Sequence, residues 1–118
     1  MALKQIDKFE EFVCTSQYYK MNNKYVFTDG IKWLLNEIYP EKPDKQSQFL
    51  ETCIYFNGFK YPFICVHLKF NKEKKQRLIE ITDGDNHVIH SITADFELDD
   101  GIYKIFVYNF VVLAASEY

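Results

Sequence analysis

The sequence predicts an α+β fold in which two N-terminal helices pack on an antiparallel meander sheet of about five strands. Near the N terminus, apolar residues recur at the three- and four-residue spacing of an amphipathic helix. From about Thr52 onward the apolar residues alternate with polar ones and become β-branched or aromatic, as in strands. Short turn-forming segments separate these later runs, so neighbouring strands are expected to pair in an antiparallel sense. Helices on one face of such a sheet would give a two-layer domain.

The first helix is expected from Lys4 to Val13, where Ile6, Phe9 and Val13 form an apolar stripe between charged residues. The second begins at Thr28, a good N-cap residue, with Asp29 in the first turn where a negative charge suits the helix dipole. Pro40 and Pro43 are expected to end it. Its apolar face consists of Ile31, Leu34, Leu35 and Ile38.

The expected strands are separated by turn chemistry rich in Asn, Asp and Gly. They run over residues 52–56, 63–70, 76–82, 87–93 and 102–108, with a further short strand at 110–113. One expected hairpin turns near Gly58 and would place Cys53 opposite Cys65. With Cys14 these make three cysteines, which form no C-x-x-C pair and suit a reducing compartment where thiols pack as small hydrophobes.

Length and charge restrict the classes of protein that fit. A chain of 118 residues with 47% hydrophobic residues and no linker predicts a single domain over residues 1–118. A formal net charge of −3 provides no general attraction to nucleic acid or to anionic membranes. No apolar stretch approaches the ~20 residues that a spanning helix needs, and charges interrupt the N-terminal region. We therefore expect a cytoplasmic location and no membrane partner.

Motifs for catalysis are missing from the sequence. There is no phosphate-binding glycine motif and no nucleophile elbow, so we expect no enzymatic activity and no cofactor. His87 and His90 would fall on opposite faces of a strand, which argues against a shared metal ion. A small metal-dependent hydrolase that uses His87 with Asp83 stays open as the least favoured alternative.

Two groups of residues are candidates for contacts with a partner. Aromatic residues make up 18% of the chain, more than its core is expected to bury, and Tyr is well suited to protein interfaces. The alternative interpretation is that these rings have a structural role and cover a small sheet that two helices are too few to bury. A Lys-rich hairpin predicts contact with RNA or DNA as an alternative function. The candidates are Tyr18, Tyr19, Tyr25 and Tyr39 for protein contacts, and Lys72, Lys74, Lys75 and Arg77 for nucleic acid.

Several segments resemble an uncharacterised family of small bacterial and mobile-element proteins. The first runs from Tyr25 to Ile38 and is similar to the family's T-D-G-[VI]-K-[WY] start and its W-L-L-x-x-I helix. The stretches 81–86, 92–98 and 115–118 are similar to its D-G-N turn, its T-D-F-P-L segment and its P-S-E-Y end. The chain departs from the pattern in three ways: the first motif runs directly into the second where the family has a spacer, Ala94 is inserted and Glu97 replaces a proline, and Ala115 replaces the final proline.

The resemblance implies a setting and carries over no catalytic residue, because no activity is established for the family. Small, acidic, aromatic-rich proteins of phages and mobile elements often disable a host defence complex. The implied function is therefore that of an anti-CRISPR-like inhibitor, with a CRISPR effector such as an RNA-guided RNA nuclease as its protein partner. The sequence leaves open whether RNA is contacted and whether the chain is a monomer or a homodimer.

Overall fold

A seven-stranded sheet forms the centre of the computed structural model, which describes residues 4–57, 60–85 and 87–118. The strands lie in the order β1-β2-β7-β6-β3-β4-β5, and every neighbouring pair is antiparallel except β2 with β7. The sheet is therefore mixed. Its strands are β1 (Tyr18–Lys20), β2 (Val26–Thr28), β3 (Phe63–Asn71), β4 (Gln76–Thr82), β5 (Val88–Thr93), β6 (Gly101–Tyr108) and β7 (Val111–Ala114).

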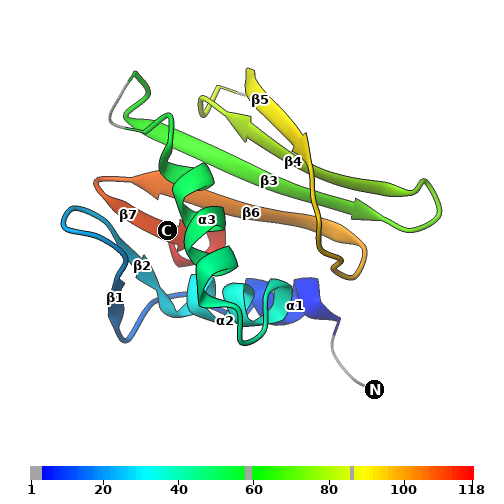
Figure 1. Ribbon diagram of the computed structural model, residues 1–118, viewed down its shortest axis with the longest axis horizontal. Helices are drawn as coiled ribbons and strands as arrows, with labels where there is room; N and C mark the ends of the chain where they lie inside the picture. Colours follow the sequence, from blue (N-terminus) through cyan, green and yellow to red (C-terminus); the bar gives the residue numbers. More distant parts are fainter. Residues whose placement is uncertain (1–3, 58–59, 86) are drawn as a thin grey trace.

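The three α-helices of the described residues pack on one face of this sheet. Figure 1 shows α3 (Pro43–Ile54) crossing in front of the sheet, with α1 (Gln5–Glu10) and α2 (Asp29–Ile38) along its lower edge. Alternate residues of the strands point toward the helices and are fully buried, as period-two patterning requires. In the central strands these residues are Ile64, Val66 and Leu68 of β3 and Tyr103, Ile105 and Val107 of β6. They form one core with the apolar stripes of α2 and α3.

The α+β prediction is confirmed, but the number and order of the strands differ from the prediction. The aromatic segment before the second helix forms β1 and β2 at one edge of the sheet. After β5 the chain crosses through residues 94–100 to the other side of β3, where β6 pairs with both β3 and β7. The prediction of a simple meander, in which each strand pairs with the next one along the chain, is therefore wrong. Turn chemistry indicates where a strand ends, but it does not determine which strand the next one will join.

The segment expected as the first strand, residues 52–56, is largely helical instead, because α3 continues to Ile54. Pro43 occupies the first turn of α3, where its fixed φ and missing N–H suit a helix start, so it begins this helix as well as following α2. Phe49, Leu50 and Cys53 form the buried stripe. The expected hairpin turn at Gly58 lies outside the described residues.

The cysteines are accordingly not paired across a hairpin. Cys53 is buried in α3 and Cys65 in β3, and both are free thiols, as is exposed Cys14. Burial raises the pKa of the Cys53 thiol to about 12, so this thiol is protonated at neutral pH and packs as a small hydrophobe.

The start of α2 is held by the C terminus. Thr28 occupies the N-cap position as predicted, but its hydroxyl donates to Glu117 Oε1 at 2.6 Å and makes no capping bond to its own helix. The Gly30 N–H donates to Glu117 Oε2 at 3.2 Å, and the Ala114 N–H donates to Glu117 Oε1 at 2.9 Å. We call these contacts the C-terminal latch. The first and last motifs of the resemblance therefore contact each other, and their Thr, Gly and Glu residues have a structural role.

No helix in the described part of the chain is long and apolar enough to cross a membrane.

Candidate functional site

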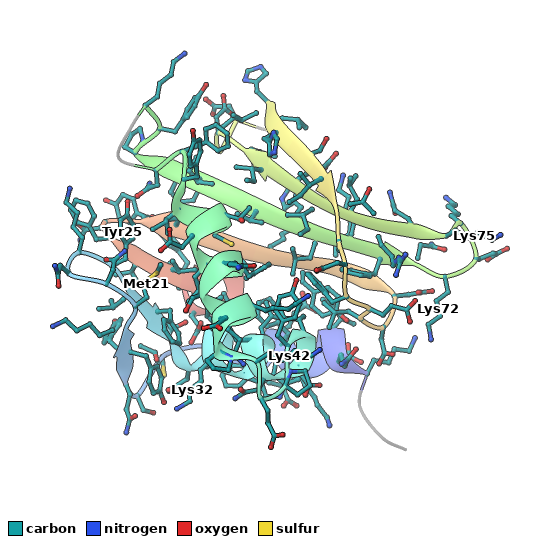
Figure 2. The ribbon with its side chains drawn as sticks, viewed as in Figure 1. Met21, Tyr25, Lys32, Lys42, Lys72 and Lys75 are labelled. Carbon is teal, nitrogen blue, oxygen red and sulfur yellow. The ribbon has the colours of Figure 1, made fainter. Side chains whose placement is uncertain are left out.

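The predicted contact residues do not form one surface. Figure 2 shows Tyr25 at one end of the molecule's longest dimension, 39 Å, and Lys72 and Lys75 at the other. The tyrosines belong to β1, the β1–β2 turn and the end of α2, whereas the lysines lie in the β3–β4 hairpin. The structure therefore places the two predicted groups on separate surfaces.

The three tyrosines near β1 and β2 differ in their surroundings. Tyr18 is 63% exposed, but Tyr25 is only 6% exposed, so Tyr25 belongs to the core and offers no ring to a partner. The Tyr19 hydroxyl donates to Asp29 Oδ1 at 3.0 Å, and this bond raises the pKa of Tyr19. The Lys32 ammonium lies 4.2 Å from the centre of the Tyr19 ring. Tyr19 is therefore held against α2.

Tyr39 also has a structural partner. Its hydroxyl donates to Asp95, whose other carboxylate oxygen lies 3.5 Å from Lys45 Nζ. Burial, followed by the bond to Asp95, raises the pKa of Tyr39, so the hydroxyl stays protonated and keeps donating. The Tyr39 ring packs edge-on against Phe96. Tyr39 thus connects the end of α2 to the crossover segment between β5 and β6.

The Lys-rich hairpin is flanked by acidic residues. Arg77 Nη1 lies 3.6 Å from Glu97 Oε1, and the Lys72 backbone N–H donates to Asp100 Oδ1. A hollow of about 270 Å³ beside the hairpin is lined by Lys72, Lys75 and Arg77 but also by Glu97. These carboxylates lower the positive potential that a phosphate backbone would meet.

The sheet face opposite the helices carries an aromatic cluster that sequence reasoning missed. Phe63 and Phe106 have ring centroids 5.0 Å apart, and Phe106 and Tyr118 are 5.4 Å apart with an edge-on geometry. Tyr108 completes the group beside Phe63 and Tyr118. We call these four residues the open-face cluster. Tyr118 is 70% exposed, so the cluster is presented outward.

The cluster borders a hollow of about 400 Å³ on the same face, lined also by Cys65, His67 and Lys104. Burial raises the pKa of the Cys65 thiol, which is therefore not an activated nucleophile. Burial also lowers the pKa of His67, and the Lys104 and Lys69 charges lower it further. Lys69 forms an ion pair with Glu80 at 2.5 Å. Among the described residues that line this hollow, Lys104 is the one cation.

We expect His67 to titrate below the ordinary histidine value of 6.5 in an NMR pH titration, because burial and two neighbouring ammonium groups disfavour the imidazolium. The Lys104→Met variant should raise the pKa of His67, since one of these charges is then gone. Because the folded protein holds His67 neutral, this residue should reduce stability as the pH falls below 6.5. A His67 pKa at or above 6.5, or one unchanged by Lys104→Met, would contradict this assignment.

No group of three or more potential metal ligands occurs within residues 4–57, 60–85 and 87–118. His87 Nδ1 lies 3.1 Å from Asp83 Oδ2, so the pair proposed for the hydrolase alternative forms an exposed contact of its own. Asn86 of the expected D-G-N turn lies outside the described residues.

Comparison of the chain with protein-family models, with curated protein sequences and with solved structures found no match.

The open-face cluster has only a weak signal in the sequence. Phe106 and Tyr108 alternate along one strand, which indicates a shared face. Their contact with Phe63 depends on the β3–β6 register, in which Phe63 pairs with Tyr108 and Cys65 with Phe106. The sequence shows neither this register nor the fact that all three helices cover the opposite face.

Proposed function

We propose that this chain is a non-enzymatic binding protein that recognises a protein partner through the open-face cluster. The observation that carries the proposal is the group of four aromatic rings, each packed against at least two of the others, on a sheet face that the α-helices do not cover. Exposed Tyr and Phe side chains supply large contact areas at low entropic cost and are common among the dominant residues of protein interfaces.

Charge favours a protein over nucleic acid at this surface. Lys69 is paired with Glu80 and His67 is kept neutral, so Lys104 is the one free cation beside the rings within the described residues. Binding to a phosphate backbone depends on several cations, and a chain with a net charge of −3 would oppose it. Aromatic rings with one cation at the margin suit an apolar protein surface that has an acidic group at its edge.

The identity of the partner rests on the resemblance alone. On the basis of that resemblance, the proposed partner is a host defence complex such as an RNA-guided RNA nuclease, and binding inhibits that complex. An RNA-binding accessory role of the Lys-rich hairpin is the competing outcome.

The test is capture from the native host with an N-terminally tagged protein, with half of each sample treated with nuclease. A protein partner that survives nuclease supports the proposal and leads to a cleavage assay of the captured complex with and without this protein. Recovery of nucleic acid alone, or recovery lost on nuclease treatment, would contradict it.

Tyr118→Ala and Tyr18→Ala are matched variants, because they remove the same exposed ring from two different surfaces. We expect Tyr118→Ala to weaken binding of the captured partner about tenfold or more, as for a dominant interface residue, and Tyr18→Ala to leave it unchanged. Isothermal titration with the purified partner measures both. The reverse result would place the interface at β1 instead.

A further inference from the structure

The outer edge of β5 is an unprotected sheet edge. β5 is the last strand in the sheet order, so within the described residues no strand pairs with its outer side. Its six residues, Val88–Thr93, include no Asp, Glu, Lys, Arg or Pro. Soluble proteins usually guard such edges with charges or proline, because unpaired N–H and C=O groups invite another strand. Val88 and Ile92 are exposed along it.

The hydrogen-bond pattern shows which groups are unpaired. The Ala94 N–H donates to the Arg77 carbonyl in line with the β4–β5 ladder. Bonding directions alternate along an antiparallel strand, so the N–H and C=O groups of Ser91 and Thr93 point away from β4. These groups can receive an added strand without disturbing the existing ladder.

A trough lies between this strand and α3. One hollow of about 470 Å³ is lined by Glu51, Thr52, Tyr55, Phe56, Ile81 and His90. A second hollow of about 280 Å³ adjoins it at Thr52 and reaches Ile92, Lys45 and Asp95. The trough therefore follows β5 along its helix side. Exposed Tyr55 packs edge-on against Phe56 at the end that Glu51 borders.

From these observations we infer that the β5 edge binds an extended segment of a partner protein by strand addition. Alternate apolar side chains of that segment occupy the trough, and a Lys or Arg side chain meets Glu51. Glu51 lies at the rim and has no ion-pair partner among the described residues, whereas Asp95 is already paired with Lys45. The unpaired edge thus selects a ligand in the extended conformation, and Glu51 at the rim of the trough selects one with a positive charge.

A second copy of this chain fits the edge less well. In a pairing of two β5 strands, the added strand would be Val88–Thr93 of the second copy, which includes no Lys or Arg to meet Glu51. A basic extended segment of another protein supplies that charge.

The test uses a phage-displayed library of random twelve-residue peptides selected on the immobilised full chain. We expect enriched peptides to share alternating Val, Ile, Thr or Phe residues and a Lys or Arg. Synthetic copies of these peptides are then measured by fluorescence anisotropy against Ser91→Pro and its matched control Ser91→Ala. Proline removes the outward N–H that strand addition needs, so we expect at least tenfold weaker binding, whereas Ser91→Ala should bind as the unchanged protein does.

Further variants keep the inference falsifiable if proline disturbs β5. Glu51→Lys, on the exposed side of α3, should weaken binding of the basic peptides at least threefold. Tyr118→Ala, on the opposite face of the sheet, should not change it, which separates this site from the open-face cluster. A selection without enrichment, equal affinity for Ser91→Pro, or equal affinity for Glu51→Lys would overturn the inference. So would a dimer in light scattering that Ser91→Pro converts to a monomer, because a second copy would then be the occupant.

Discussion

The Glu117→Ala variant is expected to lose about 3 kcal/mol of unfolding free energy. Glu117 accepts hydrogen bonds from the Thr28 hydroxyl and from the Gly30 and Ala114 N–H groups. Thr28 is only 1% exposed, so water does not readily replace the lost acceptor. The carboxylate also lies at the N-terminal end of α2, where its negative charge is favourable.

The measurement is a urea or thermal unfolding curve for each variant. For a domain of this size, a loss of about 3 kcal/mol lowers Tm by about 10 °C. Glu117→Gln is the control, because it keeps the side-chain shape and one acceptor oxygen but removes the charge, and it should lose about half as much. A loss below about 1 kcal/mol for Glu117→Ala would show that the C-terminal latch contributes little.

Gly30 provides an independent check of the C-terminal latch. A Cβ at Gly30 would lie 2.7 Å from Glu117 Oε1, so Gly30→Ala should destabilise the protein although Ala is the better helix former. In the Glu117→Ala background the carboxylate is gone and the Ala114 Cβ, 3.2 Å from the added Cβ, is the close contact that stays, so Gly30→Ala should destabilise the protein less than it does with Glu117 in place. Independent, additive effects of the two substitutions would contradict this close approach.

The Asn57→Ala variant is expected to lose about 3 kcal/mol of unfolding free energy, as much as Glu117→Ala. The reason is that Asn57 is the centre of a buried polar network. The Tyr25 hydroxyl donates to Asn57 Oδ1 at 2.7 Å. The two N–H groups of Asn57 Nδ2 are shared among the carbonyls of Tyr61, Pro62 and Val107, whose oxygens lie 3.1, 3.1 and 3.4 Å from Nδ2. Alanine leaves the buried Tyr25 hydroxyl without its side-chain acceptor, and it leaves the buried Val107 carbonyl and the partly buried Tyr61 and Pro62 carbonyls without this donor.

Tyr25→Phe is the matched control for this network, since it removes only the hydroxyl and one hydrogen bond. We expect it to cost about 1 kcal/mol in the same unfolding experiment. If Tyr25→Phe cost as much as Asn57→Ala, the network would depend mainly on the tyrosine hydroxyl. If Asn57→Ala cost less than about 1 kcal/mol, the network would not contribute as its burial implies.

The same network explains why Tyr25, which the sequence suggested as a contact residue, lies in the core. Tyr25 stands in a polar, aromatic segment that reads as a connector, and its partner Asn57 is 32 positions away. Only the fold brings the two together and buries the ring. Tyr39 is similar, because Asp95, which accepts its hydrogen bond, lies in the crossover segment after β5.

The local pattern of apolar and turn-forming residues in the sequence by itself determined the α+β class, the helix of residues 29–38 and the central strands near residues 63–70 and 76–82. Side-chain periodicity and turn residues act over a few neighbouring positions, so a sequence expresses them directly. The tertiary structure alone decided that β6 pairs with β3 and β7, that Glu117 holds the start of α2, and that one sheet face stays open with the β5 edge unpaired. These features depend on the pairing of segments that are distant in the chain, and the free energy of that pairing comes from the whole core.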